Sequence, residues 1–137
     1  MNITYTTDKI FTQEQTEELF LSVNWVSGEY PARLFKALKN SSTVITAWDG
    51  EKLVGLLRVM DDGSLVAFMH YALVRPEYQG KGIAAHMMDM VIEKYKYFLY
   101  VYCVPEESKN APFYEKFGFK VMNDGVPMLR CNFENKI

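Results

Sequence analysis

A glycine-containing loop is the part of this sequence that points most directly to chemistry. It consists of Gln79-Gly80-Lys81-Gly82-Ile83-Ala84 and lies between a stretch typical of a strand and a stretch typical of a helix. The first N–H groups of a helix have no acceptor within the helix, and they carry partial positive charge. Glycine lets a ligand approach the backbone closely, and Lys81 adds a full charge. The loop therefore predicts a binding site for a phosphate or pyrophosphate.

Other interpretations of this loop are open on its sequence alone. Residues 80–85 also match the dinucleotide pattern G-x-G-x-x-G/A, with Glu106 near the place of a ribose-binding acid. A dinucleotide domain has this motif after its first strand and several strand–helix units after it, which this chain lacks. A Walker loop is excluded because no Ser or Thr follows Gly-Lys. A glycine turn without a ligand is the remaining alternative.

The elements around the loop predict how it is held. The mostly apolar stretch Leu65–Val74 predicts a long strand before it. Ile83–Tyr95 has apolar side chains at spacings of three and four and predicts an amphipathic helix. Tyr97–Val104 is almost wholly apolar, as expected of a strand covered on both faces. A helical crossover returns the chain in the same direction, so the two strands should pair in parallel.

The whole chain predicts an α/β fold with a mixed sheet. Two helices are expected in its first third, at Gln13–Val23, with a capping box of Thr12 and Gln15, and at Pro31–Lys39. The other expected elements are strands at Ile3–Thr6, Thr43–Trp48, Lys52–Met60, Phe119–Met122 and Met128–Phe133, and a short helix at Asn110–Phe117. The order is β-α-α-β-β-β-α-β-α-β-β, in a single domain spanning residues 1–137.

Composition and charge limit the classes of function. The chain has 137 residues, 49% of them hydrophobic, and a net charge of −2, which argues against a nucleic-acid partner. No signal-peptide pattern and no apolar run of about 18 residues are present, so a cytoplasmic protein without a membrane partner is expected. Cys103 and Cys131 lie in apolar runs and are expected to be buried thiols. With His70 and His86 they lack metal-site spacing, so no metal is expected.

Two motifs together resemble the GNAT family of N-acetyltransferases. Gln79-x-x-Gly82-x-Ala84 resembles its Q/R-x-x-G-x-G/A signature, and the preceding residues 74–78 are similar to its strand end. Beyond the helix, residues 113–119 (FYEKFGF) resemble its F-Y-E-K-x-G-F segment. The chain is therefore identified as similar to a small, single-domain member. The resemblance implies a sheet splayed between its fourth and fifth strands, with acetyl-CoA in the split.

The resemblance also implies roles for individual residues in binding acetyl-CoA. The loop N–H groups from Gly80 to Ala84 would bind the pyrophosphate. Gln79, the first residue of the same signature, is expected to belong to this cofactor site as well. A strand-like pairing with the pantetheine arm would use the backbone of Leu73, Val74 and Arg75. Phe113 would pack beside the cofactor. The Asn that often contacts pantetheine in this family is replaced by Glu107, so either Asn110 makes that contact or the contact is absent.

The family chemistry is direct attack of an amine on the thioester in a ternary complex. The amine must lose a proton, because an alkylammonium has a pKa of roughly 10.4. The developing oxyanion needs a donor, expected to be a backbone N–H at the end of the Leu65–Val74 strand. The leaving CoA thiolate needs a hydrogen bond or a proton, and the resemblance implies that Tyr114 supplies it. A core aromatic is the alternative role for Tyr114.

The general base is left open by the sequence. Some relatives use a Glu on the central strand, but residues 67–72 hold no carboxylate. His70 is the only side chain there that titrates near neutrality, so it is the candidate base, with a structural strand histidine as the alternative. Glu29, Asp61 and Asp62 are loop carboxylates that could serve instead, as could a chain of water molecules.

The predicted function is acetyl-CoA-dependent transfer of an acetyl group to a primary amine of a small molecule. The alternative is a silent acyl-CoA-binding sensor or partner module. Tyr114 favours an enzyme, whereas the missing strand carboxylate leaves room for the sensor. Trp25, Tyr30 and Phe35 are candidates for lining the acceptor pocket, although aromatics at helical spacing are more often core. The assembly is left open between a monomer and a homodimer.

Overall fold

The computed structural model describes residues 2–105 and 108–133. These residues form two compact units, which divide after Cys103. The first unit contains the sheet and the longer helices, and the described part of the second contains a 3-10 turn followed by a short α-helix. Two glutamates lie outside the described residues: Glu106, the candidate ribose-binding acid of the dinucleotide pattern, and Glu107, which stands at the position of the family's Asn.

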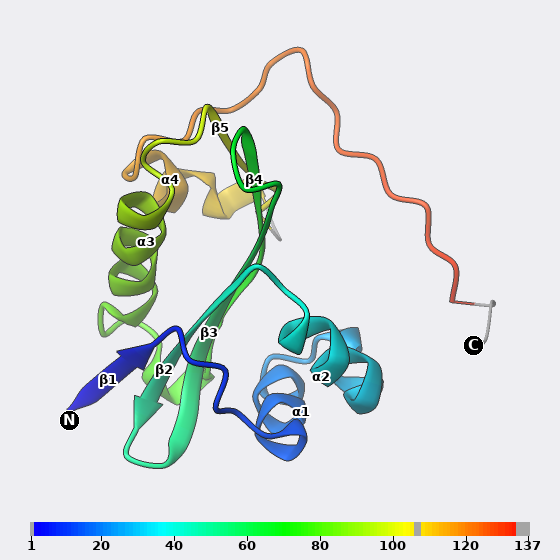
Figure 1. The fold of residues 1–137 in the computed structure, drawn as a ribbon, viewed down its shortest axis with the longest axis vertical. Helices are drawn as coiled ribbons and strands as arrows, with labels where there is room; N and C mark the ends of the chain where they lie inside the picture. Colours follow the sequence, from blue (N-terminus) through cyan, green and yellow to red (C-terminus); the bar gives the residue numbers. More distant parts are fainter. Residues whose placement is uncertain (1, 106–107, 134–137) are drawn as a thin grey trace. The chain divides into compact units, whose positions relative to one another are not determined.

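A five-stranded mixed sheet is the framework of the first unit (Figure 1). Its strands lie side by side in chain order: β1 (Ile3–Thr6), β2 (Thr43–Asp49), β3 (Lys52–Asp61), β4 (Val66–Val74) and β5 (Tyr100–Cys103). The pairs β1–β2, β2–β3 and β3–β4 are antiparallel, whereas the pair β4–β5 is parallel. The predicted α/β class is confirmed, and so is the parallel pair on either side of a helical crossover.

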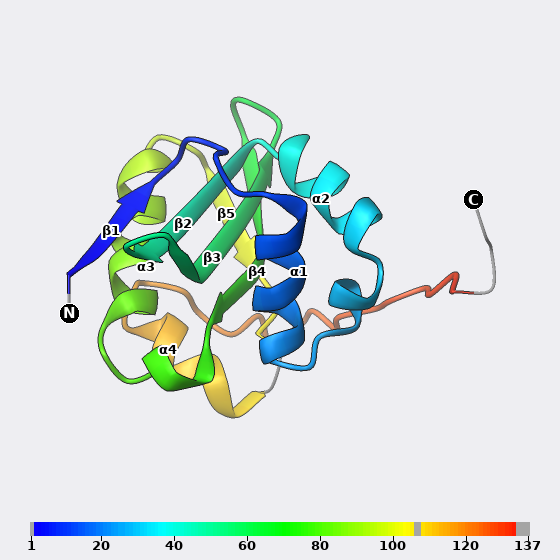
Figure 2. The same ribbon diagram turned by 90° about the horizontal axis from the view of Figure 1, so that it is seen from below.

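Helices cover the two faces of this sheet (Figure 2). On one face lie α1 (Gln13–Ser22), the short 3-10 helix η1 (Val26–Glu29) and α2 (Pro31–Lys39). On the other face lies α3 (Ile83–Lys94), the crossover helix between β4 and β5. The predicted capping box at the start of α1 is confirmed, because the side chains of Thr12 and Gln15 each accept a hydrogen bond from the other's backbone N–H.

Apolar side chains fill the space between the sheet and the helices. The core on the α1–α2 side includes Phe20, Leu38, Leu56 and Leu73, all almost fully buried. The α3 side buries Ile83, Met87, Met88 and Val91. Tyr95, just after α3, is also buried, and its hydroxyl bonds Thr43 Oγ1 and Asp61 Oδ2, each at 2.7 Å. These cores fix β3 and β4, which carry most of the candidate site.

The C-terminal part differs from the expectation. After α4 (Ala111–Glu115), residues 116–133 form no strand, so the predicted strands Phe119–Met122 and Met128–Phe133 are wrong for the described chain. Met128 and Leu129 are 93% and 90% exposed. A strand needs a ladder partner as well as apolar composition, and this segment has none in the described residues.

Exposure also corrects two smaller expectations. Cys131 is exposed rather than buried, while Cys103 is half-buried, and burial raises the pKa of its thiol to about 11. The strand β5 is shorter than predicted and is not covered on both faces, since Tyr100 is 53% exposed. Within residues 2–105 and 108–133, no helix is long and apolar enough to span a bilayer.

Candidate functional site

The glycine loop joins the end of β4 to the start of α3, as the sequence predicts. A 3-10 turn, η2 (Pro76–Tyr78), leads into it, and Gly82 is the N-cap of α3. Gly80 and Gly82 have φ angles of +77° and +83°, a left-handed conformation that other residues adopt only with strain. A Cβ added at either glycine would meet no atom within 4 Å. Their conformation, together with open space in front of the backbone, explains why glycine is needed here.

Backbone donors of this loop point to no acceptor within the described chain. The first helical hydrogen bond of α3 runs from His86 N–H to Gly82 O at 3.0 Å. For the consecutive N–H groups from Gly80 to Ala85, the described residues provide no hydrogen-bond acceptor. The exposed side chain of Lys81 stands among them. An oxyanion at this position would gain several N–H donors, the positive end of the helix dipole and a lysine charge.

Gln79 and Arg75 hold this loop in place from within the protein. Gln79 Nε2 donates to Val74 O at 2.9 Å. The buried Arg75 side chain donates from Nε to Leu53 O and from Nη2 to Glu18 Oε1, both at 2.7 Å. Arg75 N–H donates to Val54 O at 2.8 Å, so this group is not available to a ligand.

The alternation of the β3–β4 ladder decides which backbone groups of β4 stay open. Because the N–H of Arg75 faces β3, the backbone groups of Leu73 face β3 too, and those of Val74 and Ala72 face the other way. Of the predicted set Leu73, Val74 and Arg75, the geometry therefore turns only Val74 to the open side. Ala72 is an additional candidate for backbone pairing with the pantetheine arm. The alternation of backbone groups along a strand could have indicated it from the sequence.

A split opens between β4 and β5 at this end of the sheet. The strand β5 pairs only with residues Val66–Met69 of β4. From His70 to Val74, the edge of β4 away from β3 has no strand partner in the described residues. The predicted splaying between the fourth and fifth strands is confirmed, and the open edge ends at Val74, where the glycine loop is tied back to β4.

A β-bulge lies at the beginning of this open edge. Arg58 pairs with His70 and Leu57 with Ala72, so Tyr71 is the extra residue, with φ of +65°. A bulge removes backbone groups from the ladder and strains a residue that is not glycine. Tyr71 is held there by a T-shaped contact with Phe20 at 4.9 Å and by a bond between its hydroxyl and that of Ser27. A backbone donor for an oxyanion was expected in this region, but the bulge gave no sequence signal.

His70 is neutral and bonded to Arg58. Arg58 Nη1 and His70 Nδ1 are 2.9 Å apart. A guanidinium only donates, so Nδ1 accepts and the neutral ring carries its proton on Nε2. Burial, followed by the Arg58 charge, lowers the pKa of His70. Its proton-free nitrogen thus faces Arg58, and the predicted role as base would require that bond to open.

The loop carboxylates proposed as alternative bases are mostly engaged elsewhere. Asp61 accepts from the Tyr95 hydroxyl and, at 2.8 Å, from Gly63 N–H. Asp62 Oδ1 accepts from the N–H groups of residues 64–66, and these bonds lower the pKa of its carboxyl. Both stabilise the β3–β4 turn. Glu29 is exposed at the end of η1.

The aromatic residues expected at an acceptor pocket separate into two groups. Trp25 packs on Tyr71 with ring centroids 5.6 Å apart, beside the bulge. Phe35 packs on the core residue Phe11, and Tyr30 is exposed near Arg33. Trp25 is therefore the one that the structure brings to the bulge.

The second motif of the sequence lies in the second unit, around α4. Tyr114 is half-buried, in T-shaped contact with Phe113 at 5.2 Å and with Phe119 at 6.1 Å. Asn110 ends a 3-10 turn, η3 (Ser108–Asn110), just before α4. The expected roles of Asn110, Phe113 and Tyr114 toward a cofactor remain predictions.

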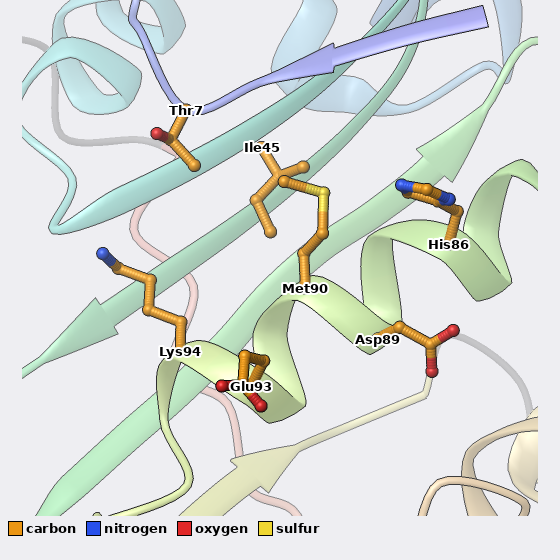
Figure 3. A pocket seen from close by; sticks show the side chains of 7 residues that line it. All are labelled: Thr7, Ile45, His86, Asp89, Met90, Glu93 and Lys94. Atoms are coloured by element: carbon orange, nitrogen blue, oxygen red, sulfur yellow. The ribbon is translucent and has the colours of Figure 1, made fainter.

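An open groove of about 440 Å³ lies elsewhere on the first unit, against α3 (Figure 3). Its lining comprises Thr7, Ile45, His86, Asp89, Met90, Glu93 and Lys94. His86 also stacks on Tyr5, with centroids 3.8 Å apart. The glycine loop does not line this groove. No group of three or more potential metal ligands occurs in the described chain.

Residues 9–119 match the family model for the acetyltransferase (GNAT) family. The chain belongs to the GNAT family. Members of this family are N-acetyltransferases that take the acetyl group from acetyl-CoA, so the chain is an enzyme of this kind. The glycine loop, the split sheet and the bulge lie within the matched residues.

Known proteins similar to this GNAT chain carry related names. An uncharacterised N-acetyltransferase, ycf52, from Porphyra purpurea is 30% identical over 118 residues, or 82% of this chain and 67% of that protein. The structure of a GNAT family acetyltransferase from Streptococcus pneumoniae is 30% identical, with a TM-score of 0.82, covering 96% of this chain and 99% of that chain. A probable acetyltransferase from Staphylococcus aureus, at 23% identity, has the same TM-score and shares the fold, covering 96% and 100% of the two chains.

The residues present fit acetyl-CoA at two places in this GNAT chain. Unpaired N–H groups and Lys81 suit the negative charge of a pyrophosphate. The open edge of β4 suits an extended molecule that contains amide groups, such as a pantetheine arm. These two features are adjacent, because Gln79 ties the loop to Val74.

Proposed function

We propose that this GNAT protein transfers the acetyl group of acetyl-CoA to a primary amine of a small molecule, by direct attack in a ternary complex. The observation that carries the proposal is the run of N–H groups from Gly80 to Ala85 at the start of α3, beside the open edge of β4, for which the described residues offer no acceptor. Binding at both places would fix the thioester near the bulge. The aromatic surface formed by Tyr71 on β4 and Trp25 before η1 suits the body of a small amine.

In the proposed reaction the deprotonated amine forms a bond to the acetyl carbon, and the bond from that carbon to sulfur breaks. The oxyanion that develops on the carbonyl would be stabilised by a backbone N–H released by the bulge. Tyr114 would give a hydrogen bond or a proton to the departing thiolate. Because His70 Nδ1 is bonded to Arg58, removal of the amine proton is assigned to water in contact with the site.

The sequence left a silent acyl-CoA-binding module open as an alternative, and the match to the acetyltransferase family favours the enzyme instead. Two observations still call for a direct test: the described part of β4 offers no carboxylate, and its histidine is bonded to Arg58. Release of CoA thiol in the presence of a panel of amines separates the two functions. Amine-dependent release supports the enzyme, and binding of acetyl-CoA without any release supports the module.

Acetyl-CoA is expected to raise the thermal stability of the protein. A ligand at a hundredfold excess over its dissociation constant stabilises the folded state by about 2.7 kcal/mol. Differential scanning fluorimetry with acetyl-CoA measures the rise in Tm. Acetyl-pantetheine, which lacks the pyrophosphate, is the matched control and should give a much smaller shift. Absence of any shift at millimolar acetyl-CoA would refute the proposed cofactor site.

A further inference from the structure

Arg58 is a half-buried cation without a carboxylate partner among the described residues. Its Nε donates to Ser41 Oγ at 2.7 Å, and its Nη1 bonds His70 Nδ1 at 2.9 Å. The guanidinium also lies over the Tyr71 ring, 5.7 Å from its centroid. The salt bridges in the described chain involve other residues. Removing a guanidinium from water without a counter-ion is costly, so this arrangement favours an anion that comes from outside the chain.

The groups around Arg58 are donors that point outward. Arg58 has five N–H bonds, and the structure gives acceptors for only those at Nε and Nη1. Nη2 of Arg58 has no partner in the described residues, where no buried side-chain nitrogen or oxygen lacks one, so Nη2 is accessible. His70 accepts at Nδ1 and therefore presents an N–H at Nε2. A guanidinium edge and an imidazole N–H next to each other match the oxygens of a carboxylate or phosphate.

This donor pair lies on the same face of the sheet as the aromatic residues beside the bulge. Arg58 and His70 are opposite each other in the β3–β4 ladder, directly before Tyr71. The His70 and Tyr71 rings are 3.9 Å apart, and Trp25 packs on Tyr71. A molecule held by Arg58 and His70 would thus have its apolar part near Trp25 and Tyr71, at the start of the open edge of β4.

We propose that the acceptor amine carries an oxyanion, a carboxylate or a phosphate, that binds Arg58 and the Nε2–H of His70. The inference rests on the proposed acetyl transfer and names the chemical class of its acceptor. Arg58 would therefore select amines that carry an oxyanion over amines that lack one. His70 donates to the acceptor rather than removing its proton.

Pairs of amines that differ only in the anionic group test this inference. Suitable pairs are an amino acid with its decarboxylated amine, and an amino sugar phosphate with the free amino sugar. With thiol release as the assay, kcat/KM for the anionic member should be higher by at least about tenfold, as expected for a hydrogen bond to a charged group. The pair that shows the preference identifies the anion as carboxylate or phosphate.

Three variants of the protein sharpen the test. Arg58→Gln should bring the kcat/KM ratio of each pair close to one, and Arg58→Lys should retain part of it, because lysine keeps the charge but not the planar fork. If Arg58→Gln does not fold, Arg58→Lys alone must lower the ratio. Arg33→Gln removes an exposed arginine from α2 and should keep the wild-type ratio. Equal rates for both members of every pair, or a preference that survives Arg58→Gln, would overturn the inference while leaving acetyl transfer intact.

A binding measurement separates this inference from failure of the proposed function. An oxyanion beside His70 should raise the pKa of its ring, which NMR of the histidine Cε1–H reports in the presence of CoA. If no amine in the panel is acetylated, the proposed function fails, but the pKa rise on addition of an anionic amine still supports the anion site. If neither turnover preference nor a pKa rise is seen, the anion site is wrong.

Discussion

Replacing Tyr114 by phenylalanine should lower kcat by at least about tenfold and leave the affinity for acetyl-CoA nearly unchanged. If the Tyr114 hydroxyl assists departure of the thiolate, its interaction matters mainly in the transition state. Proton transfer by a positioned side chain typically contributes about 10²–10⁴-fold, and water can replace part of that. The ring contacts with Phe113 and Phe119 survive the change, so the protein should fold. Thiol-release kinetics and a thermal shift with acetyl-CoA measure the two effects.

The matched control is Tyr97→Phe, which removes a hydroxyl from a ring that is 87% exposed. This variant should keep the wild-type kcat. An unchanged kcat in Tyr114→Phe would return Tyr114 to the role of a core aromatic. Single-turnover kinetics of both variants exclude the case in which product release limits the rate.

Replacing Gly82 by valine should abolish stabilisation by acetyl-CoA. The Cβ of the new side chain would extend into the open space in front of the loop, where the pyrophosphate is expected. The backbone at Gly82, with φ of +83°, is also unfavourable for a β-branched residue. The expected loss is most or all of the roughly 2.7 kcal/mol that a hundredfold excess of ligand provides. The measurement is the Tm of the variant with and without acetyl-CoA.

Gly63 offers a control for the backbone strain alone. It lies at the turn between β3 and β4 with φ of +81°, and a Cβ added there also meets no atom within 4 Å. Gly63→Val should therefore lose a similar amount of intrinsic stability but keep the full shift with acetyl-CoA. A folded Gly82→Val protein that binds acetyl-CoA normally would contradict the assignment of the loop.

The elements that can be predicted from sequence are those with strong local signals. The helix after the loop has a clear apolar face, and Gly80 and Gly82, which mark the loop in the sequence, have positive φ angles in the structure. The hairpin strands β2 and β3 follow from their apolar runs, and the Asp49-Gly50 dipeptide between them is a typical hairpin turn. Gln79 and Gly82 also belong to the family signature, so the amino-acid sequence alone predicts where a cofactor loop would lie, and the structure places that stretch between β4 and α3.

Features that depend on tertiary contacts were not visible in the sequence. The pairing of His70 with Arg58 joins residues on two strands, and it changes His70 from a candidate base to a donor. The polar groups of Arg75 are taken up by Leu53, Val54 and Glu18, which no local pattern indicates. Phe119–Met122 and Met128–Phe133 have the composition of strands, but composition does not supply a ladder partner.

The extra residue at Tyr71 reverses the odd–even order of side chains along β4. Before it, the even residues Phe68 and His70 lie opposite Met60 and Arg58, and after it the odd residue Leu73 lies opposite Leu56 on that same face. If the bulge straightened with the chain length unchanged, uniform alternation would place either the anion-binding histidine or the core leucine on the wrong side of the sheet. Deleting one of the two residues between them would instead restore uniform alternation with both side chains still on the same face. A single deletion there should therefore keep the packing of His70 and Leu73 and remove only the backbone groups that the bulge takes out of the ladder.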